Sequence, residues 1–245
     1  MNKKSIKKSF SELKKLSKNN TAKKKLLFKF NSEYLNYQPF LKDFSSQHYK
    51  IFNDLANQLN LQNSIANLFN GQIVNKTENS PALHHQYRID KPSKNFNFKK
   101  ITEPFIKGIQ KEGFENIITF GIGGSHEGPK LLQEYTENHL SKFNYFFISG
   151  PDKDEFNSIL EPLSGQKNFY IFSSKSLSTD ETLLCLKWLG RKRNSKNSIV
   201  ITANSKKAIE MGFSENCIVP FPESVGGRYS IWSPISLITG LENNF

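Results

Sequence analysis

The spacing of hydrophobic residues changes near residue 98. Up to that point they recur at helical intervals within a polar chain rich in Asn and Lys. One helix is predicted in the lysine-rich first stretch, and a second over residues 47–68, with Gly71 as its stop. The apolar face of the first helix consists of Ile6, Phe10, Leu13 and Leu16. Residues 1–98 are therefore expected to form a helical N-terminal arm that ends in a loop over residues 90–97.

From residue 99 onward, short apolar runs alternate with helical patterns. The runs are β-branched or aromatic and do not alternate strictly, which is typical of strands buried on both faces of a sheet. They cover residues 117–122, 143–148, 169–172 and 199–202. Helices are expected near residues 129–140, 154–160, 179–189 and 206–211. This order predicts an α/β fold over residues 99–245, with a doubly wound parallel sheet flanked by helices.

The net charge of +12 is concentrated at the N-terminus. Residues 1–29 hold eleven Lys and one Glu, a charge of +10, and the remaining residues together carry only +2. A solvated amphipathic helix is the favoured interpretation, and a contact with a polyanion or a membrane surface is the alternative. The stretch has no arginine that could form bidentate hydrogen bonds with phosphates, so we expect no nucleic-acid partner.

Other sequence features limit the location and the cofactors. No stretch approaches the roughly 18 apolar residues of a membrane helix, and the N-terminus has no apolar core of a signal peptide, so no membrane association is expected. Cys185 and Cys217 are the two cysteines, and neither has metal-ligand spacing around it. We therefore expect a cytoplasmic protein with no metal and no cofactor.

Three segments that follow the predicted strands carry candidate chemistry. The glycine turn (residues 121–129) could present backbone amides to an anion, or it could be only a tight connection. It matches neither the dinucleotide-binding nor the P-loop spacing. In the hydroxyl loop (residues 173–182), helix capping accounts for one or two hydroxyls, whereas the cluster with Lys175 favours a phosphate monoester. In the arginine segment (residues 224–234), Arg228 follows two glycines and could enter a crevice or lie on the surface.

These segments together resemble the glucose-6-phosphate isomerase (phosphoglucose isomerase) family. The sequence VGGRYSIWS at residues 225–233 is similar to the family signature VGGRYSxWS, and SKSLSTDET at 174–182 resembles its phosphate loop SKTFTTxET. The turn IGGS at 122–125 and the arm motif that includes Asn75, Glu78 and His84 also match in order and spacing. The likeness covers residues 68–233, with Ser80 where the family usually has arginine.

The resemblance implies a sugar isomerase (SIS) fold and a set of roles. Gly124 and Ser125 would contact the sugar. Arg228, with Gly227, would stabilise the charge of an enediolate between glucose 6-phosphate and fructose 6-phosphate. The phosphate would be held by Ser174, Lys175, Ser176 and Thr179.

The chain has about half the family length and stops at Phe245, so it is expected to be a fragment. The second SIS domain, with the catalytic base, is then absent and the chain alone inactive. Glu127 is the one candidate carboxylate to replace the base, although a helix-dipole partner is the favoured interpretation. The full-length enzyme would be a homodimer of glycolysis and gluconeogenesis. The alternative is a non-catalytic SIS module that binds sugar phosphates.

Overall fold

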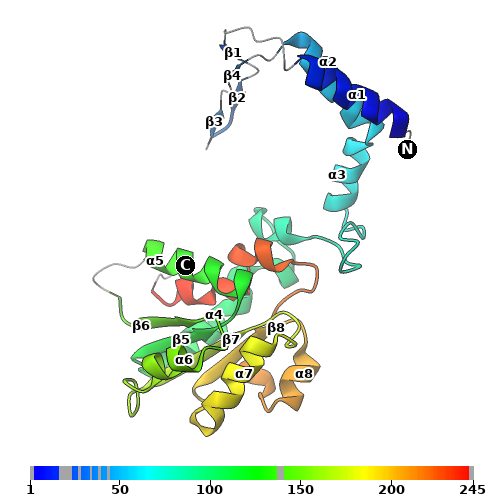
Figure 1. Cartoon of the computed structure of the whole chain (residues 1–245). Coiled ribbons are helices and arrows are strands. Elements are labelled where there is room, and N and C mark those ends of the chain that lie inside the picture. Colours follow the sequence, from blue (N-terminus) through cyan, green and yellow to red (C-terminus); the bar gives the residue numbers. More distant parts are fainter. Residues whose placement is uncertain are drawn as a thin grey trace. The chain divides into compact units, whose positions relative to one another are not determined.

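The computed structural model describes residues 3–16, 24–26, 29–33, 35–37, 40–42, 45–136 and 141–242. The chain divides into two compact units, Met1–Asn70 and Gly71–Phe245, and each is described by itself (Figure 1). Residues 71–98 thus belong to the same compact unit as the sheet. The expected boundary near residue 98, between a helical arm and an SIS domain, stays a prediction.

The first unit contains the predicted basic helix as α1 (Lys3–Leu16), which contacts α2 (Ser46–Gln58). The prediction of a single helix over residues 47–68 is wrong. Asn60 has a φ of 52°, and this left-handed residue separates α2 from α3 (Leu61–Phe69). Asparagine tolerates that conformation better than most residues, so hydrophobic spacing alone did not reveal the break. Gly71, with a φ of 69°, follows the end of α3 as expected.

Two short antiparallel strand pairs lie between α1 and α2. The sequence pattern did not predict them, because strands of two or three residues are too short to show a period. The first pair is β1 (Lys24–Leu26) with β4 (Phe40–Lys42), and the second is β2 (Phe30–Asn31) with β3 (Asn36–Tyr37).

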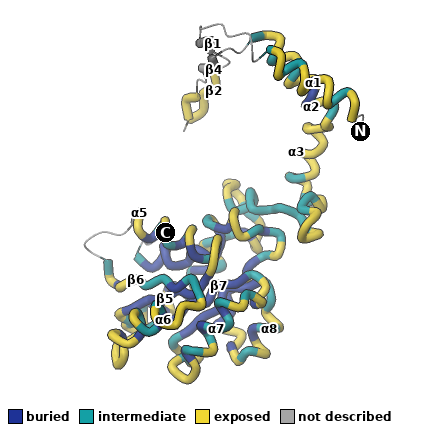
Figure 2. Tube along the Cα trace, in the orientation of Figure 1, coloured by how far each residue is buried: buried dark blue, intermediate teal, exposed yellow. Residues whose placement is uncertain are grey.

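The second unit is built on a five-stranded parallel sheet in the order β6-β5-β7-β8-β9. Its strands are β5 (Asn116–Phe120), β6 (Asn144–Ile148), β7 (Asn168–Ser173), β8 (Ser198–Thr202) and β9 (Ile218–Pro220). The first four confirm the predicted strands, whereas β9 was missed because it has only three residues. Every residue of β5 and β8 is buried, as expected for strands covered on both faces (Figure 2).

Helices cover both faces of this sheet. Figure 1 shows α7 and α8 on one face, and α5 with the C-terminal 3-10 turns on the other. The helices are α4 (Phe98–Lys111), α5 (Glu127–Thr136), α6 (Lys153–Leu160), α7 (Asp180–Leu189) and α8 (Ser205–Glu210). The four predicted helices of this region are confirmed, although residues 137–140 of the first lie outside the described residues. The C-terminal turns are η6 (Gly227–Trp232) and η7 (Pro234–Gly240), and all of η7 is buried.

Candidate active site

Two of the segments singled out in the sequence leave neighbouring strands at the same edge of the sheet. The glycine turn follows β5 and the hydroxyl loop begins at the end of β7, where Phe120 and Phe172 are paired. From β5 the chain passes to β6 on one side, whereas β7 lies on the other side of β5. The strand order therefore reverses at this point, and open α/β sheets bind ligands in the crevice beyond such a reversal.

The glycine turn and the arginine segment pack backbone against backbone. A Cβ atom on Gly124 would lie 2.0 Å from the carbonyl oxygen of Gly227, so only glycine fits there. The Ser230 hydroxyl, which is buried, donates to the Gly227 carbonyl at 2.7 Å and lies 3.3 Å from the Gly124 carbonyl. Three residues of the expected sugar site, Gly124, Gly227 and the adjoining Arg228, are thereby brought together across more than 100 positions of sequence.

Residues 83 and 84 hold the arginine segment from the other side. The Leu83 amide donates to the carbonyl of Ser224 at 2.8 Å, and the His84 ring stacks on Tyr229 with centroids 4.3 Å apart. Burial lowers the pKa of His84, and the nearby charge of Arg88 lowers it further. A neutral imidazole is thus favoured against Tyr229. The guanidinium of Arg228 lies 5.8 Å from the centre of the Tyr229 ring and is exposed.

The hydroxyls of the loop after β7 bond to one another. Ser174 is buried, and its Oγ lies 3.2 Å from Oγ1 of Thr179. The hydroxyls of Ser176 and Ser178 lie 2.5 Å apart. Thr179 occupies the N-cap position of α7, yet its side chain accepts no capping bond. Capping therefore leaves these hydroxyls unexplained, and they gather beside the first amides of α7, where an anion would be stabilised.

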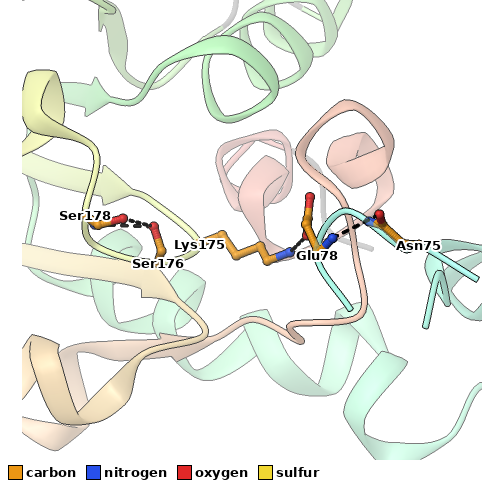
Figure 3. Close-up of polar contacts among 5 residues, drawn as sticks. All are labelled: Asn75, Glu78, Lys175, Ser176 and Ser178. Atoms are coloured by element: carbon orange, nitrogen blue, oxygen red, sulfur yellow. Dashed lines mark hydrogen bonds and ion pairs between the residues drawn. The ribbon is translucent and has the colours of Figure 1, made fainter. Parts of the chain in front are cut away.

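Lys175 is paired with a carboxylate from the segment before the sheet. Its Nζ donates to Oε2 of Glu78 at 2.5 Å (Figure 3). The hydrogen bond and the charge of Lys175 lower the pKa of Glu78, and the more distant charge of Arg228 acts in the same direction. Both side chains line a pocket of about 370 Å³, together with Ser80, Ser176, Ala203, Asn204 and Glu223. The sequence analysis gave Glu78 no role, and its only signal was its place in the arm motif with Asn75 and His84.

The remaining candidates of the glycine turn lie at the start of α5. Ser125 ends the short 3-10 turn η3 (Gly123–Ser125), and its amide donates to the Ile122 carbonyl at 3.1 Å. Glu127 is the first residue of α5, and its Oε1 lies 2.9 Å from Nδ1 of His126. The position of Glu127 in the first turn agrees with a dipole partner.

Within the parts of the chain that the structure describes, no group of three or more His, Cys, Asp or Glu side chains is arranged to hold a metal ion. In the same residues, none of the helices has the length and apolar character needed to span a bilayer.

Comparison with known proteins identifies the family. The sequence model of the phosphoglucose isomerase family matches residues 41–245. This range includes the glycine turn, the hydroxyl loop and the arginine segment. The chain belongs to the phosphoglucose isomerase family. Its curated relatives include the glucose-6-phosphate isomerase of Buchnera aphidicola subsp. Cinara cedri, 32% identical over 252 residues. The glucose-6-phosphate isomerase of Legionella pneumophila is 33% identical over 213 residues.

These matches extend over most of this chain and part of each relative. They cover 87% of the chain and 46% of the Buchnera protein, and 77% of the chain and 42% of the Legionella protein. The chain thus spans about half the length of these phosphoglucose isomerase relatives. The crystal structure of a glucose-6-phosphate isomerase from Chlamydia trachomatis shares the fold, with a TM-score of 0.66 over 82% of this chain and 43% of that one, at 19% identity.

Proposed function

We propose that this chain carries the sugar-phosphate-binding part of a glucose-6-phosphate isomerase. The reaction would interconvert glucose 6-phosphate and fructose 6-phosphate through an enediolate, as a step of glycolysis and gluconeogenesis, which would place the protein in the cytoplasm. The observation that carries the proposal is the meeting of three segments at the reversal of strand order. One edge of the sheet thus presents the hydroxyl loop, the glycine turn and the Arg228 guanidinium together.

The phosphate would bind at the hydroxyl loop. Ser174, Lys175, Ser176 and Thr179 form that loop, and its hydroxyls can turn from one another to donate to phosphate oxygens. The first amides of α7 point toward the same place, and the positive end of the helix favours an anion.

The sugar would extend from this loop toward the glycine turn. Gly124 and Ser125 would contact it, and Gly227 would let the backbone approach C1 and C2 closely. Arg228 would stabilise the negative charge that develops on the enediolate oxygen, an interaction stronger in the transition state than in the bound sugar. Its exposed guanidinium and the absence of any salt bridge to it among the described residues leave it available for that role.

We infer that the proton-transferring base lies outside these 245 residues. A base must come within hydrogen-bond reach of the C2 proton, about 2.6–3.2 Å. Glu127, the nearest candidate in sequence, hydrogen-bonds to His126 instead. We propose that a second SIS domain supplies the base and that the complete enzyme acts as a homodimer.

Binding and activity test the proposal separately. In calorimetry the chain should bind glucose 6-phosphate and not glucose, because the phosphate provides the anchor; equal binding of the two sugars would contradict the phosphate site. In a coupled assay the chain alone should give negligible fructose 6-phosphate, and coexpression with the other half of a family enzyme should restore activity.

In the restored enzyme, Arg228→Ala should lower kcat much more than it raises KM. An unchanged kcat would remove Arg228 from the chemistry. Strong activity of the 245-residue chain alone, abolished by Glu127→Gln, would make Glu127 the base. Binding without activity in any combination would favour the non-catalytic SIS module.

A further inference from the structure

The side chain of Lys175 points away from the hydroxyls of its own loop. Figure 3 shows it extended toward Glu78, whereas Ser176 and Ser178 face each other on the opposite side. The lysine side chain is 29% exposed and that of Glu78 is 45% exposed, so the pair is partly shielded from water. A simple phosphate-binding lysine would be expected to direct its ammonium toward the hydroxyls.

Glu78 is held in place by its own turn. Asn75 and Ser80 exchange two backbone hydrogen bonds of 3.1 Å, and the Glu78 amide donates to the side-chain oxygen of Asn75 at 3.3 Å. The carboxylate therefore stands on a closed turn. A lysine ammonium that bonds to this carboxylate is held in one position, whereas an unpaired lysine side chain would sample many rotamers.

The backbone of Lys175 is fixed as well. Its carbonyl oxygen accepts bonds from the Thr202 hydroxyl and the Ala203 amide, both at 3.0 Å. Lys175 lies between Ser174 and Ser176, two of the residues proposed to bind the phosphate. Anchoring this residue at its carbonyl and at its ammonium therefore restricts both neighbours.

We propose that Lys175 and Glu78 are positioning residues that act as a pair. The ion pair ties the turn at residues 75–80 to the hydroxyl loop and orders the hydroxyls and amides that bind the phosphate. The charge of Lys175 is already balanced by Glu78, so the phosphate is bound by the hydroxyls and by the first turn of α7. This inference rests on the proposed function for its ligand, but the ordering of the loop does not depend on any ligand.

Exchange of the two charges tests the pair. Lys175→Glu places two carboxylates against each other, and should weaken binding of glucose 6-phosphate at least about tenfold in calorimetry, as expected for loss of a charged hydrogen bond. The double variant Glu78→Lys with Lys175→Glu restores an ion pair of opposite direction. It should bind glucose 6-phosphate within about threefold of the unaltered chain, because only the tether matters.

A ligand-free measurement keeps the inference separate from the proposed function. Hydrogen exchange of the amides in residues 174–179 should accelerate in Glu78→Gln and in Lys175→Met, and return to the original rate in the charge-exchanged variant. The matched control exchanges the charges of Glu103 and Lys107, an exposed ion pair of 2.7 Å on α4, and should change neither measurement.

Three results would overturn the proposal. Binding by the charge-exchanged variant as weak as that of Lys175→Glu, with the fold intact, would show that the ammonium contacts phosphate directly. Tighter binding by Glu78→Gln would show that Glu78 competes with the phosphate. Unchanged exchange rates in both single variants would show that the pair does not order the loop. A chain that fails to bind glucose 6-phosphate would contradict the proposed function, and the exchange rates would still decide the role of the pair.

Discussion

Gly124 and Gly227 approach each other so closely that a Cβ atom on Gly124 would lie 2.0 Å from the Gly227 carbonyl oxygen. The reverse is not true, because a Cβ atom on Gly227 would have no neighbour within 4 Å. Glycine is therefore required on steric grounds at position 124 but not at position 227. Gly124 leaves room for the arginine segment, whereas Gly227 leaves open space where the sugar is proposed to bind.

This asymmetry predicts unequal effects on stability. Gly124→Ala should lower the free energy of unfolding by about 1–3 kcal/mol or more, because the added methyl forces two backbones apart. Gly227→Ala should change it by about 0.5 kcal/mol or less, as at an exposed site without steric conflict. Urea denaturation of the two variants provides the comparison. Equal losses would mean that the two segments are not packed as described.

The hydroxyl pair of Ser174 and Thr179 predicts a loss of phosphate affinity. Ser174→Ala combined with Thr179→Ala removes two donors next to α7, and each hydrogen bond to a charged group contributes about 1.5–3 kcal/mol. Calorimetry with glucose 6-phosphate should show binding weakened by a factor of ten or more. Ser164→Ala, at an exposed serine outside the loop, is the control. If the double variant bound as tightly as the control, the phosphate would have to bind elsewhere.

The basic N-terminal stretch should be dispensable for sugar-phosphate binding. Its charge lies within residues 1–29, and all the proposed binding residues belong to the compact unit Gly71–Phe245. A chain that starts at Phe30 should keep its affinity for glucose 6-phosphate at physiological salt, where salt weakens interactions between solvent-exposed charges. A large loss of affinity by a folded shortened chain would assign the lysines a part in ligand binding.

The His84–Tyr229 stack predicts a dependence of stability on pH. Burial lowers the pKa of His84 below its ordinary value of 6.5, so the unfolded chain binds the proton more readily than the folded chain. This histidine should therefore cost stability as the pH falls from about 6.5 through the lowered pKa. His84→Phe keeps a ring against Tyr229 and removes the titration.

Thermal unfolding between pH 7 and pH 5 checks this dependence. Over that interval the unaltered chain should lose more stability than the His84→Phe variant. Parallel losses in the two proteins would indicate that His84 is protonated equally in the folded and unfolded states.

The sequence by itself determined the α/β class, four of the five strands of the large sheet and the helices between them. Buried strands such as β5 and β8 must be apolar on both faces, and that requirement is visible as short runs such as residues 117–122 and 199–202. The segments that carry polar chemistry were also visible, because they follow those runs directly. A backbone conformation such as that of Asn60 depends on one residue, and it left no mark in the period of the hydrophobic pattern.

Only the tertiary structure decided which of these residues meet. Gly124 and Gly227 are joined because a 3-10 turn after β5 lies against one that follows β9, and Lys175 finds Glu78 because residues 71–98 pack with the sheet. A sequence motif identifies the side chains of a segment, but it does not give the direction in which each side chain points. The ammonium of Lys175 bonds to the carboxylate of Glu78, since a charge that is partly withdrawn from water is more stable when it is paired. This pairing depends on distances between residues in the folded chain, which cannot be derived from the spacing of residues along the sequence.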